Sequence, residues 1–319
     1  MLNFAPNVTL LYHKNGLPAI LVGKQNKKQK TKRKQEKMIK LCAFSDEADS
    51  TLEGQIKALN ENSIPYMEVR GINGKSVINF TVEEAKEYIK EMQDNGIAVW
   101  SVGSSLGKVD INCDFAAYKD KVKHVCELAK IFKTNKIRMF SFYEAFKERN
   151  KVIDYLSQMV EIGNEYGVLM CHENEKDIYG DVGERCVDVL DNVKGLKCVY
   201  DPANFIQCGE KADNTLKLLH HRAEYFHIKD VDEKTQAIVP AGYGDGKVDK
   251  LIADITDDKV LTLEPHLSSF VGFKSIDKTE MKHKFSFATS RDAFDAAVKA
   301  TKDLLVKAGY KEKDGVFNK

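Results

Sequence analysis

The stretch GVLMCHENE, residues 167–175, places a histidine and two glutamates directly after an apolar run. The VLM segment is typical of a strand that enters a hydrophobic core. Charge directly behind such a strand, here His172, Glu173 and Glu175, indicates that the strand end meets solvent, a metal or a substrate. The same order of apolar run and polar end recurs along the chain, and this recurrence predicts the fold.

Eight short apolar runs alternate with amphipathic stretches from residue 39 onward. Eight βα units over about 270 residues predict an α/β fold, a (β/α)8 TIM barrel, with a doubly wound open sheet as the alternative. No GxGxxG or GxxxxGK[ST] pattern follows a strand, which disfavours the nucleotide-binding form of that alternative. The expected strands are 39–44, 66–70, 97–103, 136–142, 167–172, 197–201, 225–229 and 259–264.

The chain of 319 residues is expected to hold one barrel domain, residues 38–319, behind a basic N-terminal extension, residues 1–37. That extension has nine Lys or Arg residues against one acid, Glu36, and no apolar periodicity. We interpret it as disordered or as a frayed helix upstream of the fold. RNA, anionic lipid and an import receptor are alternative partners for so basic a run. The whole chain has a net charge of +1 and the extension has +8, so residues 38–319 carry about −7.

The seven cysteines show no CxxC spacing, which favours reduced, packed thiols in a cytoplasmic protein over a zinc finger. The apolar segments near the N-terminus are too short and interrupted for a membrane span or a standard signal peptide. We therefore expect neither a membrane nor a nucleic acid as partner. A small-molecule substrate and a possible homo-oligomer are the expected associations.

Glu173 directly follows the fifth predicted strand, Asp201 ends the sixth, His227 lies within the seventh and Glu264 ends the eighth. These residues are 28, 26 and 37 residues apart. In a barrel these side chains share the C-terminal rim, where active sites lie. Three facing carboxylates would repel one another unless a cation lies among them. The oxygen-rich set suits Mn²⁺, Mg²⁺ or Co²⁺, with Zn²⁺ also possible. The alternative is four separate ion-paired or solvated residues.

The motifs HENE, DPANF, HIKD and LEPHL, in this order, resemble the xylose-isomerase-like TIM-barrel superfamily and its sugar phosphate isomerase/epimerase members. The likeness covers nearly the whole chain from residue 38. It implies one divalent metal, Mn²⁺ first, bound by Glu173, Asp201, His227 and Glu264. It also implies that Glu173 and Glu264 are catalytic and exchange a substrate proton across an enediolate.

The function implied by the resemblance is a metal-dependent isomerase or epimerase of a small sugar, sugar phosphate or polyol. A dehydratase of a cyclic polyol or keto-sugar derivative is the alternative on the same metal site. An endonuclease-IV-like phosphodiesterase ranks lower, because the second and third strands end without histidine, and so does a non-enzymatic sugar-binding protein. Two positions depart from the ketose epimerases: Asn204 stands where they have histidine, and Glu233 where they have arginine.

Several further residues are candidates for substrate binding. Lys229 shares a strand face with His227 and could reach a substrate oxygen or phosphate, or pair with a carboxylate. Glu68 and Arg70 share a face near the end of the second strand, where an arginine can bind a carboxylate or phosphate through two hydrogen bonds. By strand alternation His172 points away from Glu173, so the alternative to substrate binding for this residue is a supporting or packing role. The set of candidates is Lys229, Arg70, Glu68, Asn204, His172 and Tyr143.

Overall fold

The computed structural model describes residues 37–268, 282, 283, 285–313 and 315–319. The predicted basic extension, apart from Lys37, lies outside the described residues. Within the described part of the chain, no helix is both long and apolar enough to cross a bilayer.

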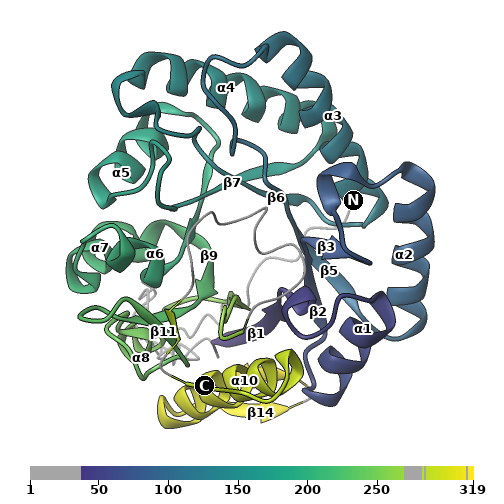
Figure 1. Cartoon of the computed structure of the whole chain (residues 1–319), viewed down its shortest axis with the longest axis vertical. Coiled ribbons are helices and arrows are strands. Elements are labelled where there is room, and N and C mark those ends of the chain that lie inside the picture. The colour runs from purple at the N-terminus through teal and green to yellow at the C-terminus, as the bar shows by residue number, and fades with distance from the viewer. Residues whose placement is uncertain (1–36, 269–281, 284, 314) are drawn as a thin grey trace, which may run out of the picture. The chain divides into compact units, whose positions relative to one another are not determined.

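Eight parallel strands form a closed ring in which each strand pairs with two parallel neighbours (Figure 1). Closure is made by β1 and β12, with Ile39 opposite Lys259 and Ala43 opposite Leu263. The predicted barrel is therefore confirmed. Its strands are β1 (Met38–Ala43), β2 (Tyr66–Val69), β5 (Ala98–Gly103), β6 (Lys136–Met139), β7 (Leu169–Glu173), β8 (Lys197–Tyr200), β9 (Ala223–Ile228) and β12 (Lys259–Leu263).

Helices follow every barrel strand and surround the ring in Figure 1. A capping box begins α2: the Thr81 side chain accepts from the backbone of Glu84, and the Glu84 side chain accepts from the backbone of Thr81. The helices are α1 (Leu52–Glu61), α2 (Val82–Asp94), α3 (Phe115–Ile131), α4 (Arg149–Tyr166), α5 (Gly183–Asn192), α6 (Pro202–Gln207), α7 (Ala212–Leu219), α8 (Val248–Ala253) and α10 (Ser290–Lys307).

Each barrel strand differs from its predicted bounds by at least one residue, and two of the differences have clear physical reasons. β7 begins at Leu169 rather than at residue 167, because Gly167 ends α4 in the left-handed region with φ of 71°. β6 ends at Met139 rather than at residue 142, because the next residues bond to a loop instead of a strand. Phe140 N–H donates to the carbonyl of Leu106, and Phe142 has φ of 67°.

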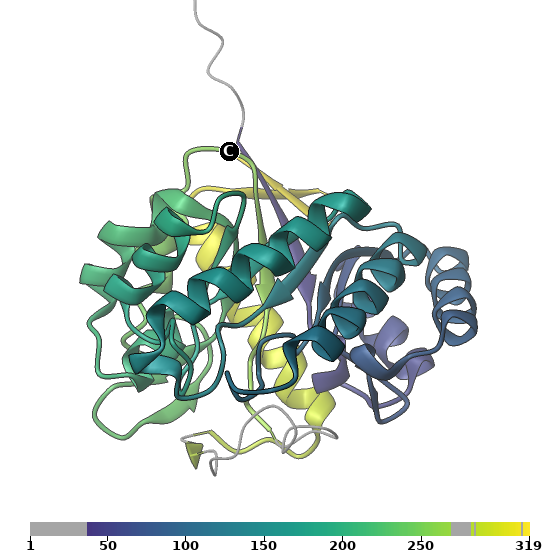
Figure 2. The same cartoon turned by 90° about the horizontal axis from the view of Figure 1, so that it is seen from above.

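Short strands outside the barrel were not predicted. β3 (Gly71–Ile72) and β4 (Lys75–Ser76) form a hairpin around Asn73-Gly74, both with positive φ, which is a sequence signal for such a turn. β10 (Asp230–Asp232), β11 (Ala237–Val239) and β13 (Lys282–His283) make a small sheet. β15 (Val316–Asn318) joins β14 (Lys311–Lys313) to the start of β1, at the end of the barrel where the C-terminus lies (Figure 2).

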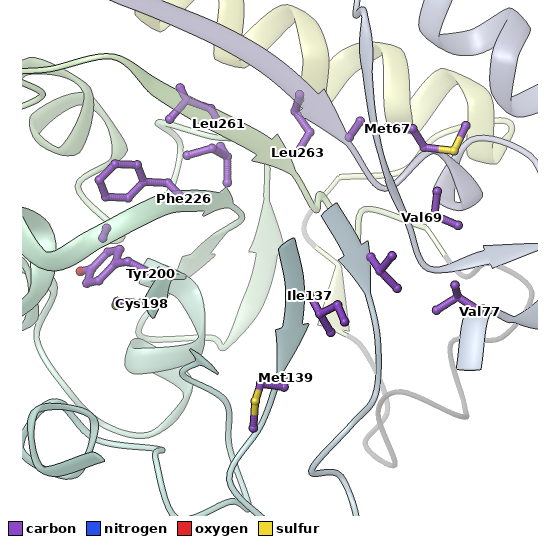
Figure 3. Close-up of a cluster of buried hydrophobic side chains, with 14 of the residues drawn as sticks. Met67, Val69, Val77, Ile137, Met139, Cys198, Tyr200, Phe226, Leu261 and Leu263 are labelled. Carbon is purple, nitrogen blue, oxygen red and sulfur yellow. The ribbon is translucent and has the colours of Figure 1, made fainter. Parts of the chain in front are cut away.

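Alternation along the strands separates an outer apolar layer from the barrel interior. Met67, Ile137, Tyr200, Phe226 and Leu261 belong to the large hydrophobic core cluster (Figure 3). The residues next to them in each strand point to the opposite face, because successive strand side chains alternate. The inward set includes a small apolar layer of Cys42, Cys171, Val199, Tyr225 and Val260 and, beyond it toward the C-terminal rim, Glu173, Asp201, His227 and Glu264.

Asp230 organises the loop that follows β9. Its buried carboxylate accepts four backbone N–H groups, from Val231 and Gly246 at Oδ1 and from Gly242 and Gly244 at Oδ2, at 2.8 to 3.1 Å. Since Asp230 directly follows Lys229 at the barrel rim, this loop is fixed to the edge of the candidate site.

We expect Asp230→Ala to lower the free energy of unfolding by about 3 kcal/mol, because four buried N–H donors lose a charged acceptor. Asp230→Asn should have an intermediate effect, since it keeps one acceptor oxygen. Urea unfolding measures both, and Asp249→Ala, an exposed acid in the first turn of α8, is the control with a change within about 0.5 kcal/mol. A wild-type unfolding midpoint for Asp230→Ala would contradict this role of the carboxylate.

Candidate metal centre

Four buried side chains converge inside the rim of the barrel: Glu173, Asp201, His227 and Glu264. Each is at most 2% exposed, and each offers one ligand atom such that all four atoms lie within 4.8 Å of one another. They come from the C-terminal ends of β7, β8, β9 and β12, as the spacing of their motifs predicted. The structure therefore brings together the whole set of predicted metal ligands.

Hydrogen bonds hold the imidazole of His227 in one orientation. Its Nδ1 lies 3.0 Å from Glu173 Oε1 and 3.2 Å from Glu264 Oε2, and its Nε2 lies 3.2 Å from Glu68 Oε2. The hydroxyl of Tyr225 donates to the other oxygen of Glu68 at 2.8 Å. Glu68, a predicted substrate-binding residue, thus contacts the far side of the histidine and orients Nδ1 toward the acids.

Three cationic side chains surround the acids. Arg70 donates from Nη1 to Glu264 Oε1 at 3.0 Å, and Arg138 Nη1 lies 3.2 Å from Glu173 Oε2. Lys229 Nζ lies 3.2 Å from Asp201 Oδ2 and 3.8 Å from Glu264 Oε2. Each carboxylate is therefore next to at least one fixed positive charge, which offsets part of its desolvation.

The remaining donors of Arg70 bind the short 3-10 helix η1 (Ser45–Glu47). Nε and Nη2 donate to the two oxygens of Asp46 at 2.9 and 3.0 Å, and Nη2 also donates to Glu47 at 3.0 Å. Arg70 was predicted to bind substrate, but these contacts give it a structural role as well, because it ties the start of the chain's first βα loop to Glu264.

Protonation in the cluster follows the competition between burial and neighbouring charge. Burial raises the pKa of Asp201 to about 7, with Lys229 opposing the shift. Burial alone would raise the pKa of Glu264, but Lys229 and His227 hold it well below its usual range. Burial alone would lower the pKa of His227, whereas Glu173 and Glu68 hold it well above its ordinary value. The cluster thus favours a positive charge at its centre.

The residues fit a divalent cation. Glu173 Oε2, Asp201 Oδ2 and Glu264 Oε2 are buried and receive no aligned hydrogen bond from the described residues, so three carboxylate oxygens remain as ligands. Together with the Nδ1 edge of His227 they form an oxygen-rich donor set of the kind that Mg²⁺, Mn²⁺ and Zn²⁺ use in proteins. This buried cluster suggests a divalent metal site.

Two other predicted candidates, Asn204 and Tyr143, differ in their contacts with the cluster. Asn204 touches it, because its Nδ2 donates to Glu173 Oε1 at 3.3 Å and to the carbonyl of Asn174 at 2.9 Å. The backbone of Tyr143 bridges to Asp110 and Ile178 in neighbouring loops.

Glu233, the second departure from the ketose epimerases, lies away from the cluster. Its side chain is partly exposed and pairs with Lys211.

His172 faces away from the cluster, as strand alternation predicted. Its Nε2 lies 2.9 Å from Ser141 Oγ, and the same hydroxyl accepts the backbone N–H of Gly180 at 2.7 Å. The ring therefore supports the loop after β7 from behind, and burial lowers the pKa of His172 to about 3.

Arg138 is a residue of the site that the sequence analysis did not predict. It lies in β6, where its charge interrupts the otherwise apolar run around Ile137 and Met139. The available signal in the sequence was an arginine inside a predicted strand, because alternation places it on the same face as the other interior residues. In the structure this arginine is only 3% exposed.

Comparisons with known proteins agree with this fold. Residues 56–279, more than two thirds of the chain, match the family model described as xylose isomerase-like TIM barrel. No curated protein sequence matches the chain.

Solved structures with the same fold share little sequence with the chain. The probable 3-DHS dehydratase AsbF of Bacillus anthracis is similar at 17% identity and a TM-score of 0.64, over 83% of this chain and 98% of that one. The IOLI protein with a binding zinc atom is similar at 16% identity and a TM-score of 0.65, over 84% and 99%. D-psicose 3-epimerase is similar at 14% identity and a TM-score of 0.65, over 85% and 99%. At these identities the likeness shows the fold.

The buried His172 predicts a specific loss of stability in acid. The unfolded chain binds a proton at this residue near pH 6.5, whereas the folded chain does so only near pH 3. The stability that it contributes is complete above pH 6.5 and is lost as the pH falls toward 3, with a slope of about 1.4 kcal/mol per pH unit. We expect the free energy of unfolding to fall less steeply between pH 6 and pH 5 in His172→Gln.

Urea unfolding at a series of pH values measures these slopes. The matched control is His221→Gln, which removes an exposed histidine. Equal slopes for the wild type and His172→Gln would show that His172 is protonated in the folded protein over this range.

Proposed function

The chain belongs to the xylose isomerase-like TIM barrel family, and from this premise we propose that it is a metal-dependent isomerase or epimerase. Its substrate is a small sugar, sugar derivative or polyol, and the reaction runs through an enediolate. One divalent metal, with Mn²⁺ first and Mg²⁺, Co²⁺ or Zn²⁺ as alternatives, is held by Glu173, Asp201, His227 and Glu264.

One observation carries this proposal: Glu173 and Glu264 both lie within 3.2 Å of the same edge of His227, and each keeps one buried oxygen without an aligned donor. They come from β7 and β12, which are separated in the ring by β8 and β9. Two carboxylates that approach one centre from different strands can remove a proton on one face of a planar intermediate and return it on the other.

A bound divalent cation would supply the Lewis acidity that polarises a carbonyl and its neighbouring hydroxyl. The chain's own residues perform the remaining steps. One glutamate takes the proton from the carbon next to the carbonyl, and the other glutamate gives a proton back, so that no proton is gained or lost overall. Lys229, 3.2 Å from Asp201 and 3.8 Å from Glu264, can donate to a substrate oxygen in the same space.

The positions that depart from ketose epimerases favour a substrate other than a free ketose. Asn204 offers an amide donor where those enzymes have a histidine, and Glu233 pairs with Lys211 instead of reaching the site. The second candidate function is a dehydratase, in which the same deprotonation is followed by loss of a β-hydroxyl group. The similarity to a probable 3-DHS dehydratase is compatible with it.

Metal content tests the ligand set directly. Protein purified without chelators should hold about one divalent ion per chain, and Asp201→Asn and His227→Ala should each lower the affinity at least about tenfold. Asp201→Asn is preferred to alanine because Asp201 Oδ1 also caps α6 through the N–H groups of Ala203 and Asn204. Elemental analysis gives the occupancy, with Asp254→Asn, an exposed acid paired with Lys250, as control. Unchanged metal in both site variants would exclude these ligands.

Solvent exchange tests the proton transfer. In deuterated water, the metal-loaded protein should exchange the hydrogen next to the carbonyl of its substrate, as nuclear magnetic resonance can follow across ketoses and cyclic keto acids. Glu173→Gln and Glu264→Gln should slow this exchange about 10²- to 10⁴-fold, while Glu91→Gln on the exposed face of α2 should not.

Two results of the exchange experiment would redirect the proposal. A new conjugated absorbance, formed with loss of water, would identify the dehydratase. Full exchange in both glutamine variants, with metal retained, would exclude the glutamates as proton carriers.

A further inference from the structure

A cavity of about 220 Å³ lies beside the candidate metal centre, at the ends of β2, β5 and β6. Its charged lining residues are four cations, Arg70, Lys75, Lys108 and Arg138, against one acid, Asp46. The volume is below the roughly 300 to 1,000 Å³ of sites for drug-sized ligands, so the cavity suits a small molecule or one end of it.

Arg138 keeps unused hydrogen-bond donors at this cavity. Its Nη2 donates to the carbonyl of Gly103 at 3.2 Å, and its Nη1 lies 3.2 Å from Glu173, while the buried Nε has no partner among the described residues. A guanidinium has five N–H groups, so more than one remains for a ligand. The rings of Phe44 and Phe140, with centroids 5.2 and 4.6 Å from the guanidinium carbon, hold the group in place.

The wall of the cavity offers little negative charge in return. Both oxygens of its single acid, Asp46, already accept hydrogen bonds from Arg70, and its other polar uncharged side chains are Ser50, Ser76, Asn79 and Ser105. A charged acceptor for this wall must therefore come from the ligand. A charged acceptor makes shorter and stronger bonds to a guanidinium than a neutral hydroxyl does, and a planar carboxylate can accept two of them at once.

The pairing of the other cations argues for a single negative charge on the ligand. Lys108 lies 2.9 Å from the partly buried Glu175, and Lys75 lies 2.6 Å from Glu84. A dianion such as a phosphate ester would add two charges to a wall whose lysines are already paired with acids. A carboxylate adds one, opposite the donors of Arg138.

We propose that the substrate carries a carboxylate and that this group binds in the cavity against Arg138. The inference rests on the proposed function, since the rest of the same molecule would reach the candidate metal centre. The two arginines connect the two places: Arg138 contacts Glu173, and Arg70 contacts Glu264 at 3.0 Å. One arginine thus links the place of the carboxylate to each catalytic glutamate, and this arrangement selects small polyhydroxy or keto acids over neutral sugars.

Calorimetric titration with matched ligands tests the proposal. The probes are D-glucuronate, D-glucose and D-glucose 6-phosphate, and the corresponding galactose series, titrated into metal-loaded and metal-free protein. The uronates should bind at least about tenfold more tightly than the neutral sugars, and this preference should weaken with added salt. Arg138→Gln should abolish the preference, and Arg138→Lys should keep part of it.

Two further variants separate local from general effects. Lys108→Gln lies in the same cavity and should reduce the preference, and it serves where Arg138→Gln does not fold. Arg149→Gln removes an exposed arginine, paired with Asp188 outside the cavity, and should leave the preference intact. Equal binding of uronates and neutral sugars, or a full preference in Arg138→Gln, would overturn the proposal. Tighter binding of the 6-phosphates would overturn the assignment of a carboxylate.

The outcomes distinguish this inference from the proposed function. If metal occupancy and proton exchange meet expectation but acids have no advantage, the cavity proposal alone fails. If acids bind with the expected preference, in metal-free protein and in Asp201→Asn, but proton exchange is absent, the reaction proposal alone fails.

Discussion

The mutual repulsion of three buried carboxylates is the constraint on which the interior of this barrel depends. Glu173, Asp201 and Glu264 place one oxygen each within 4.8 Å of one another. Two unit charges 4 Å apart interact by about 4 kcal/mol at an effective dielectric constant of 20, so the three cannot remain ionised without positive charge nearby. Arg70, Arg138 and Lys229 supply part of that charge. The three carboxylate oxygens and the Nδ1 edge of His227 are arranged so that a bound cation could supply further positive charge.

The barrel is what makes this arrangement possible. Parallel pairing brings the ends of β7, β8, β9 and β12 to one rim, and alternation turns one side chain from each strand inward. Tyr200, Phe226 and Leu263, which are outward neighbours of Asp201, His227 and Glu264, belong to the apolar layer under the helices, which stabilises the strands independently of the charges inside. The fold can therefore hold a costly cluster, because the hydrophobic burial that stabilises the barrel lies on the other face of each strand.

The sequence was sufficient to predict the barrel and the four clustered residues, because apolar runs that alternate with amphipathic stretches mark the strands and their ends. Glu173, Asp201 and Glu264 each end an apolar run, so parallel topology makes them neighbours. His227 lies inside its strand, and the motif HIKD with its family resemblance added it to the set. Arg138 was missed because it lies within a run, where only the register decides which side chains face inward. The cavity could not be predicted, because Lys108 reaches it from a loop whose path depends on backbone hydrogen bonds from Phe140 and Phe142, beyond the end of β6, and on Gly107, with φ of 85°.

Arg138 contacts both the cavity and a carboxylate of the cluster, so the two are electrostatically coupled. Its Nη1 lies 3.2 Å from Glu173 Oε2, and the same side chain lines the cavity, so one planar guanidinium sets the position of a ligand carboxylate relative to the cluster. A neutral sugar offers this guanidinium no charged acceptor. Binding of the proposed substrate class would thus position the reacting carbon relative to Glu173, which links the specificity of the cavity to the proton transfer.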